Sequence, residues 1–467
     1  MKVVIVGAGA VGTQLAMQLI DEKKDVVLIE RDPEQARLAS NRLDCMVITD
    51  QGNSVQVLRD AGTAEADFFV AVTDNDEVNL ISCALVESEF SVPCKIARVR
   101  NIDYSSSGLA QRNFLGIDYI VNPEIVAAES IIRTIEHGAV SDIVLFDQSS
   151  TQMRHLTVEE RSIFANRTLA EIGRDVDVPF LVAIILRNDE FMIPAGQTRI
   201  EPGDLLYLVA TEDHFDRLYQ RIGKPKAEIR KIVIVGGGKV GQRVATFLLE
   251  DKRPANIIGR LLRAATARRR YSVKIVDRDY ARCKELSQML SDALVIHADV
   301  SDEGVFEEEH FANSDLIVAV TGNQELNLIA AVYAKSIGIR RSIALVNKTN
   351  YTRIASQLGV DVPVSIKNSM VNSILRIVRR GNVRSVHSIA NGELEVMDIR
   401  VDMQSIASGT AIRDLKLPRD TLIVSLLRKG ETRVPDGAQT LEGGDRVIVI
   451  SRRESIEPLQ QLFTGPA

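Results

Sequence analysis

The sequence of 467 residues lacks any apolar run long enough to cross a membrane. It also lacks the hydrophobic segment of a signal peptide, because its first residues lead directly into a predicted strand. Its charges are nearly balanced, with 57 lysines and arginines against 63 aspartates and glutamates, and no block of one sign dominates. We therefore expect no integral membrane segment and no nucleic acid partner, and any membrane association must be peripheral.

The sequence is also poor in patterns that build a catalytic or metal centre. The four cysteines, Cys45, Cys83, Cys94 and Cys283, stand apart without C-x-x-C spacing, so we expect small buried thiols in a reducing cytoplasm. No H-E-x-x-H, G-x-S-x-G or paired-carboxylate pattern occurs. Only His297 among the histidines falls near a predicted ligand edge, where a structural role is favoured. The sequence therefore predicts no metal site and no catalytic residue.

What the sequence does contain is a glycine turn near its beginning. An apolar, β-branched run is broken by Gly7, Gly9 and Gly12 and is followed by an amphipathic helical pattern. In a nucleotide-binding turn these glycines serve the tight turn, the close approach of a phosphate and the packing of helix on sheet. A second strand ends at Glu30, whose carboxylate accepts hydrogen bonds from ribose hydroxyls and repels a 2′-phosphate. This order predicts binding of a dinucleotide or an adenine nucleotide.

Polar residues also follow the third and fourth predicted strands. Asp50 ends the third strand, where ligands collect in an open parallel sheet, although it also suits a helix cap. A polar loop that begins at Thr73 follows the fourth strand. We expect Thr73 or Asp74 to cap the next helix, and Asn75 and Asn79 to face the nucleotide.

Two arginines are candidates for contact with the ligand. Arg98 and Arg100 share one face of the fifth predicted strand, and Arg98 is placed to meet a phosphate. A solvated or salt-bridged arginine is the alternative. Arg31 directly follows Glu30 and either lies over the adenine ring or remains at the surface.

The second half of the chain repeats this order. Gly236, Gly238 and Gly241 follow the first three glycines at an offset of 229, which indicates a duplicated domain. Leu345 and Asn347 stand where the first half has its two arginines, so the two sites are not expected to bind one ligand equally. The other matching residues of the second half are Asp277 and Arg278 at the second strand, Asp299 at the third strand, and Thr321 in the loop 321–327.

Strands alternate with helices in both halves, which predicts an α/β fold with a duplicated Rossmann-like, doubly wound parallel sheet. Each copy is followed by a small α+β domain, whose residues Glu201, Asp204, Glu442 and Asp445 we assign to turns rather than to a site. An insert near 252–271 carries three successive arginines, 268–270, which we interpret as a solvated face, with an anion or partner contact as the alternative. The expected segments are 1–139 and 231–382 for the nucleotide-binding domains, 224–230 for a linker, and 140–223 and 383–467 for the small domains.

Two functional classes fit these features. An NAD-dependent oxidoreductase with duplicated Rossmann domains would need a proton donor or nucleophile beside the cofactor, and neither small domain offers a dense polar cluster. Two complete nucleotide modules without evident catalytic groups favour a sensor that binds without turnover. A nucleotide-binding scaffold without any link to transport shares the same sequence features.

The duplicated order of motifs resembles the RCK (regulator of K⁺ conductance) family. Each half has G-x-G-x-x-G, an acidic strand end, an Asp after the third strand and T-x-x-x-E-x-N after the fourth. A small domain with P-x-G and E-x-G-D turns follows, as a TrkA-C domain follows a TrkA-N domain in that family. The resemblance extends over essentially the whole chain, and two modules without a membrane span resemble the peripheral subunit of bacterial Trk potassium uptake systems.

The resemblance implies a regulator rather than an enzyme. It implies binding of NAD or NADH, and in many members ATP or ADP, and assembly into a ring in which four chains supply eight RCK modules. It further implies docking on a membrane potassium channel subunit of the TrkH or TrkG type, at the cytoplasmic face of the plasma membrane. The residues that it assigns to the ligand, together with those between the glycines, are Gly7, Ala8, Gly9, Ala10, Val11, Gly12, Glu30, Arg31, Asp50, Thr73, Asn75 and Arg98 in the first half, and Gly236, Gly238, Lys239, Val240, Gly241, Asp277, Arg278, Asp299 and Thr321 in the second.

Overall fold

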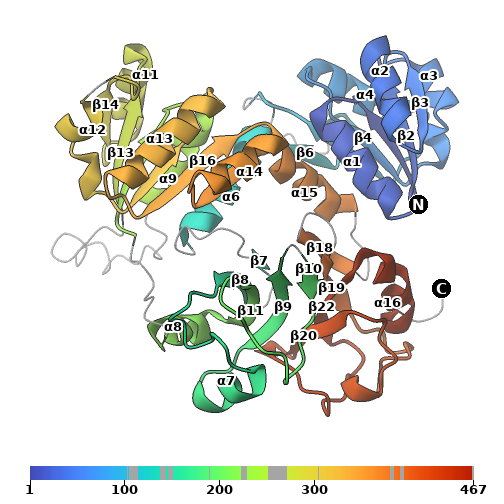
Figure 1. Ribbon diagram of the computed structural model, residues 1–467. Coiled ribbons are helices and arrows are strands. Elements are labelled where there is room, and N and C mark those ends of the chain that lie inside the picture. Colours follow the sequence, from blue (N-terminus) through green and yellow to red (C-terminus); the bar gives the residue numbers. More distant parts are fainter. Residues whose placement is uncertain are drawn as a thin grey trace, which may run out of the picture. The chain divides into compact units, whose positions relative to one another are not determined.

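The computed structural model confirms the predicted fold class. It contains two parallel six-stranded sheets with flanking helices and two antiparallel five-stranded sheets (Figure 1). Contacts group the chain into two compact units, Met1–Ser141 with Glu228–Val378, and Asp142–Ala227 with Arg379–Ala467. The structure describes residues 1–101, 104, 114–136, 144–145, 151–188, 190–221, 229–250, 271–302, 304–378, 383–389 and 394–464. The arginines of the predicted insert and most of the predicted linker lie outside these residues.

The first parallel sheet has the strand order β3-β2-β1-β4-β5-β6. The strands between Lys2 and Val121 are short and apolar. The central residues of β1, β2, β4 and β5 are buried, as expected where helices cover both faces, whereas those of the edge strands β3 and β6 are only partly buried. The order reverses between β1 and β4, and such a switch point opens a crevice at the carboxyl ends of the strands. The elements are β1 (Lys2–Val6), α1 (Ala10–Asp21), β2 (Asp25–Glu30), α2 (Pro33–Arg42), β3 (Met46–Thr49), α3 (Val55–Asp60), β4 (Phe68–Ala71), α4 (Asp76–Glu89), β5 (Cys94–Arg98), β6 (Tyr119–Val121) and α6 (Pro123–Glu136).

The second parallel sheet repeats this topology in the order β14-β13-β12-β15-β16-β17. Its crevice therefore lies between β12 and β15. The elements are β12 (Lys231–Val235), α9 (Lys239–Leu249), β13 (Ser272–Asp277), α11 (Tyr280–Met289), β14 (Leu294–His297), α12 (Val305–Glu308), β15 (Leu316–Ala319), α13 (Gln324–Ser336), β16 (Arg341–Val346), α14 (Thr349–Gln357), β17 (Val362–Ser365) and α15 (Ile366–Val378).

The two halves of this unit exchange their last helices. The apolar face of α6, including Ile131 and Ile135, is buried in the core of the second half beside Val244 of α9. The apolar face of α15, including Ile374, is buried in the core of the first half beside Leu15 of α1. Figure 1 shows α6 among the elements of the second half and α15 close to α1. Each half therefore completes its core with a helix from the other half.

The small domains pair in the second unit. One face of each antiparallel sheet joins a shared apolar cluster that includes Ile184 and Val209 of the first sheet and Val424 and Ile448 of the second. The described elements are β7 (Val144–Leu145), β8 (Thr151–Thr157), α7 (Leu169–Asp175), β9 (Leu181–Arg187), β10 (Glu190–Met192), β11 (Leu205–Thr211), α8 (Glu212–Arg221), β18 (Val383–Ile389), β19 (Leu394–Arg400), β20 (Thr421–Arg428), β21 (Glu431–Arg433), β22 (Arg446–Arg452) and α16 (Ile456–Phe463).

In each small domain, one arginine guanidinium binds both carboxylates of the acidic turn, an arrangement that we call the arginine fork. Arg187 Nε and Nη2 each donate to a carboxylate oxygen of Asp204 at 2.7 Å, and Nη1 donates to Glu201 at 2.6 Å. Burial alone would raise the pKa of Asp204, but the hydrogen bonds from Arg187 and from the Glu201 amide hold that pKa below its usual value. Arg428 repeats the fork with the corresponding carboxylates, Glu442 and Asp445. These carboxylates bind the turn to the strand, which agrees with their assignment to turns.

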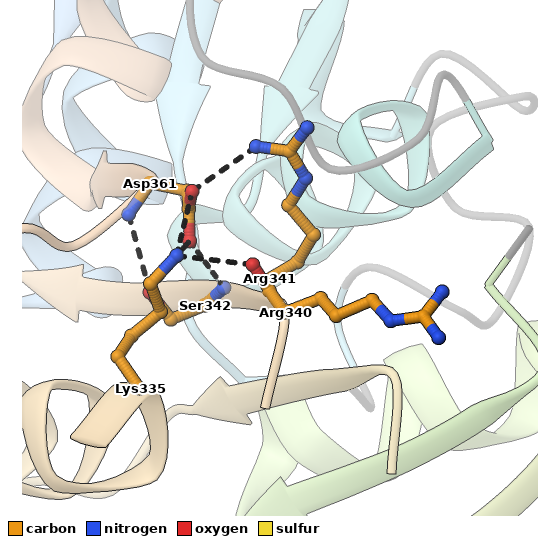
Figure 2. Close-up of polar contacts among 5 residues, drawn as sticks. All are labelled: Lys335, Arg340, Arg341, Ser342 and Asp361. Carbon is orange, nitrogen blue, oxygen red and sulfur yellow. Dashed lines mark hydrogen bonds and ion pairs between the residues drawn. The ribbon is translucent and has the colours of Figure 1, made fainter. Parts of the chain in front are cut away.

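An ammonium group occurs at the same place in both parallel sheets, buried in the first and half-buried in the second, although it comes from different elements. In the second half, Lys335 of α13 donates to Asp361 at 2.9 Å and to the Arg340 carbonyl at 3.0 Å (Figure 2). In the first half, Lys95 of β5 lies 3.3 Å from Asp118. Asp118 and Asp361 are equivalent, because each carboxylate accepts from a main-chain N–H of the neighbouring strand, Lys95 at 2.7 Å and Ser342 at 2.8 Å.

The helix residue at this place has the opposite charge in the first half. Glu87 of α4 lies where α13 has Lys335, and its carboxylate is 3.0 Å from Lys95 Nζ. Burial opposes the charge of Lys95, but hydrogen bonds from its ammonium group to Glu87 and Asp118 leave its pKa above the usual value. The cation therefore comes from the strand in one repeat and from the helix in the other, and the aspartate, Asp118 or Asp361, is the carboxylate partner that both repeats keep.

We expect Lys335→Met to lower the stability of the first unit by about 1–2 kcal/mol, because the partly buried Asp361 loses two charged hydrogen bonds. The double variant Lys335→Glu/Ser342→Lys recreates the arrangement of the first half and should recover most of that loss. Calorimetric unfolding of the full chain measures both changes. An unchanged midpoint for Lys335→Met would show that Arg341 and Ser342 alone satisfy Asp361.

Candidate functional site

The first glycine turn connects β1 to α1 at the switch point of the first sheet. Gly7 has a φ of +105°, and a Cβ there would lie 3.0 Å from the Thr73 amide nitrogen, so this position requires glycine. A Cβ at Gly12 would lie 1.8 Å from the Gly7 carbonyl oxygen, so α1 packs directly against the turn. A Cβ at Gly9 would meet no atom within 4 Å, so the space above Gly9 is open. The turn thus presents its bare helix start to an open volume.

Glu30 fixes this turn from the end of β2. One carboxylate oxygen accepts from the Ala8 amide at 2.6 Å and the other from the Asp32 amide at 2.9 Å. Each oxygen keeps a further lone pair for another donor. The carboxylate is therefore held at the edge of the open volume in an orientation that suits two vicinal hydroxyls.

The prediction that Asn79 faces the nucleotide is wrong. Asn79 is fully buried, and its side-chain oxygen accepts from the amide and the hydroxyl of Thr73 at 2.9 and 2.7 Å. Its side-chain nitrogen donates to the Thr73 and Arg98 carbonyls at 3.1 and 2.8 Å. Asn79 therefore joins the ends of β4 and β5, while Asn75 rather than Thr73 or Asp74 provides the helix cap by accepting from the Val78 amide at 2.7 Å.

Arg98 lies at the end of β5 and points to the turn. Its guanidinium is partly buried and donates to the Thr73 carbonyl at 3.0 Å. Burial, reinforced by the nearby Arg100, lowers the pKa of Arg98, although an arginine remains charged at neutral pH. No carboxylate of the described residues forms an ion pair with Arg98. Asp76, Glu124 and Asp74 favour its charge from a greater distance. Because the guanidinium is bonded only to carbonyl groups, it can also bind an anion in the cavity.

These residues surround a cavity of about 660 Å³, a volume typical of small-molecule sites. Ala8 and Gly12 do not line it, because they support the turn from inside. Three lining residues, Asn347, Ile366 and Lys367, come from the second half, and no sequence motif predicts them here. The sequence-predicted residues that line the cavity are Gly7, Gly9, Ala10, Val11, Glu30, Arg31, Asp50, Thr73, Asn75 and Arg98.

The second glycine turn has the same framework. Gly236 has a φ of +104°, a Cβ at Gly241 would lie 1.9 Å from the Gly236 carbonyl oxygen, and the space above Gly238 is open. Asp277 accepts from the Gly237 amide at 2.6 Å and from the Asp279 amide at 2.9 Å, as Glu30 accepts in the first half. Thr321 and Asn327 repeat the hydrogen bonds of Thr73 and Asn79, at 2.8 Å to the amide and 2.7 Å to the hydroxyl.

The side chains around this second turn differ from those of the first. Lys239 begins α9 and donates to the Arg100 carbonyl of the first half at 3.3 Å. Arg282 Nε donates to the Gly237 carbonyl at 2.7 Å and so covers part of the turn. Asp299 accepts from the hydroxyl and amide of Ser301, which lowers its pKa. The second turn is thus a related but more crowded and differently charged surface, with Val240 buried beneath it.

The outer residues of the second turn contact one another and the main chain. Arg278 is exposed, 4.0 Å from Asp299, and His297 is hydrogen-bonded to the Arg278 carbonyl at 3.1 Å and packs edge-on against Tyr280. Within the described part of the chain, no group of histidine, cysteine or acidic side chains is arranged to hold a metal ion. The described helices also include none that is long and apolar enough to cross a membrane.

Comparison with protein families gives the same duplicated order. The model of the TrkA-N domain matches residues 3–123 and 232–366, and that of the TrkA-C domain matches residues 153–223 and 396–464. The chain belongs to the TrkA family. Both TrkA-N matches end at the start of the exchanged helices, α6 and α15.

TrkA relatives match this chain along its whole length. The Trk system potassium uptake protein TrkA of Azorhizobium caulinodans is 31% identical over 99% of this chain and 98% of its own length. That of Halomonas elongata is also 31% identical, over the same shares of the two chains. A TrkA homolog of Archaeoglobus fulgidus is 31% identical over 99% of this chain and all of its own. The chain is thus a TrkA-like RCK regulatory protein of potassium uptake.

Solved structures share the fold of this TrkA family chain. The GsuK channel bound to NAD has a TM-score of 0.55 and 18% identity, and the match covers 99% of this chain and 78% of that one. The GsuK RCK domain has a TM-score of 0.54 and 18% identity, with coverage of 99% and 94%.

Proposed function

We propose that this chain is the peripheral, cytoplasmic regulatory subunit of a Trk potassium uptake system, and that it gates a membrane-embedded channel subunit of the TrkH or TrkG type. The observation that supports this most strongly is the match of both tandem modules, over the whole chain, to proteins named for Trk potassium uptake. A duplicated glycine turn, with a cavity at its first copy, supports the role of a nucleotide sensor. The protein would dock at the inner face of the plasma membrane.

The ligand that fits the first cavity is NAD or NADH, with ATP or ADP as further candidates. The bare amides at the start of α1 suit a pyrophosphate, and the open space above Gly9 gives it room. Glu30 is placed for the ribose hydroxyls and disfavours a 2′-phosphate. The GsuK channel has been solved bound to NAD, which agrees with this choice.

We propose further that four chains assemble into a ring of eight modules. Apolar side chains are exposed on two helices that cover the same face of the second sheet. They are Ile329, which is 66% exposed, with Tyr333 on α13, and Ile354 with Leu358 at the end of α14. An apolar surface of this kind is typical of a protein contact and supports assembly through it. A ligand that binds one conformation of the ring more tightly than another shifts the equilibrium between them, typically by a coupling free energy of about 1–3 kcal/mol. The conformational change would then act on the pore.

The test is reconstitution of the full chain with a channel subunit in liposomes, with potassium flux followed while NADH, NAD, ATP or ADP is added. We expect the chain to bind the channel and the flux to depend on at least one nucleotide. The absorbance of NADH is followed at the same time. Steady consumption of NADH without an effect on flux would favour an oxidoreductase, and nucleotide binding without any channel association would favour a scaffold unrelated to transport.

A further inference from the structure

The exchange of helices places one residue of each half at the nucleotide turn of the other half. The equivalent aspartates, Asp118 and Asp361, lie 243 positions apart and precede the exchanged helices by the same number of residues. The same offset aligns Glu124, near the start of α6, with Lys367, near the start of α15. The two turns are therefore approached by residues of opposite charge.

At the first turn the approaching residue is a cation. Lys367 lines the cavity, partly buried, together with Arg98 and Arg100 of the first half. Burial, with a contribution from Arg42, lowers the pKa of Lys367, and a bound anion would favour its charged form. The cavity thus has basic side chains on the wall from the first half and on the wall from the second.

The residue of α6 that corresponds to Lys367 is an anion, Glu124, whose charge also acts on Arg98 of the first half and favours its charged form. The Arg100 carbonyl accepts from Lys239 Nζ at 3.3 Å and from the Asn122 side chain at 3.1 Å, and Asn122 in turn accepts from the Glu124 amide at 3.0 Å. This chain of contacts places the start of α6 beside the start of α9. One carboxylate oxygen of Glu124 is buried and has no hydrogen-bond donor within the described structure. Leu345 replaces the arginine of β5, so the basic residues that remain beside this turn are Arg282, whose Nε donates to the Gly237 carbonyl, and Lys239.

On the basis of the proposed function, we propose that Lys367 binds the outer phosphate of the nucleotide at the first turn, from across the interface between the halves. Glu124 repels a phosphate at the equivalent place of the second turn. The first site then takes a nucleotide with two or more phosphates, such as a dinucleotide, ADP or ATP. The second site takes a nucleoside monophosphate in preference to these. The specificity of each site is set by the helix that it receives from the other half.

Calorimetric titration of the full chain with AMP, ADP, ATP and NADH, in buffer free of divalent cations, tests this proposal. Gly238→Val isolates the first site and Gly9→Val the second. On the Gly238→Val background we expect Lys367→Gln to lower the affinity for ADP and for ATP by about tenfold or more, because a charged hydrogen bond is lost. The affinity for AMP should fall by less than about threefold. Lys367→Arg should keep the affinity for ADP, which separates charge from packing. Circular dichroism of each variant reports its folding.

The second site supplies a test that does not depend on Lys367. On the Gly9→Val background, Glu124→Lys should raise the affinity of the second site for ADP by about tenfold and change its affinity for AMP little. If Lys367→Gln weakens AMP and ADP alike, or Glu124→Lys leaves ADP unchanged, the proposed division of specificity is wrong while nucleotide binding itself stands. If the unmodified chain binds none of the four nucleotides, the nucleotide-dependent function proposed above fails as well.

Discussion

Gly9→Val is expected to abolish nucleotide binding at the first turn without lowering the thermal stability of the protein. A Cβ at Gly9 meets no protein atom within 4 Å, and the residue has an ordinary extended conformation, with φ −66° and ψ −171°. The valine side chain therefore fits the free protein but fills the space in front of the α1 amides, where a pyrophosphate would lie. We expect the affinity for NADH to fall by about a hundredfold or more, measured by titration calorimetry.

Two other glycine substitutions serve as controls for this prediction. Gly238→Val makes the same change at the second turn and should leave first-site binding intact. Gly12→Val should instead cost about 3 kcal/mol of stability, because its Cβ would lie 1.8 Å from the Gly7 carbonyl oxygen. Undiminished NADH binding in Gly9→Val would show that the phosphates lie elsewhere. A large loss of stability in that variant would contradict the openness of the space above Gly9.

Asn79→Leu should destabilise the first unit by about 3 kcal/mol, the largest effect on stability that we expect from a single polar side chain. The substitution keeps the approximate size but leaves the Thr73 amide and the Thr73 and Arg98 carbonyls without their buried partner. Because Thr73 and Arg98 both line the cavity, nucleotide affinity should fall as well. Calorimetric unfolding and NADH titration measure the two effects.

Asn327→Leu provides the matched control for this second prediction, because Asn327 makes the same hydrogen bonds in the second half. It should lower stability by a similar amount and leave binding at the first turn nearly unchanged. Equal loss of first-site binding in both variants would mean that the effect of Asn79 on the ligand is indirect.

The features that the sequence predicts well here are those that depend on local backbone geometry. Gly7 and Gly236 occupy left-handed conformations, as the turn motif requires, and the second strand ends at Glu30 as predicted. The fold class follows from the alternation of such elements. The part played by Asn79 could not be predicted, because a polar residue on a helix that follows a strand can face the ligand or the buried strand ends. Only the packing of α4 on β5 decides between them.

No local sequence pattern predicts the residues that the second half contributes to the first cavity. Lys367 stands more than 240 residues from the nearest first-half residue of the cavity and belongs to no motif. Its position depends on the burial of Ile374 and its neighbours in the core of the first half. Helix amphipathicity shows that α15 buries one face but does not show against which sheet. The order of the four domains along the chain likewise does not indicate that the two nucleotide-binding domains form one compact unit and the two small domains another.

The exchange of α6 and α15 also bears on how such a protein can change over evolutionary time. In a symmetric dimer of single-module chains, each substitution occurs twice, so both nucleotide sites change together. Once two modules are joined in one polypeptide, a substitution alters one site alone. Glu124 and Lys367, and likewise Glu87 and Lys335, occupy equivalent positions with opposite charges. Fusion of the modules thus allows the two sites to specialise separately, while the exchanged helices keep the two halves joined.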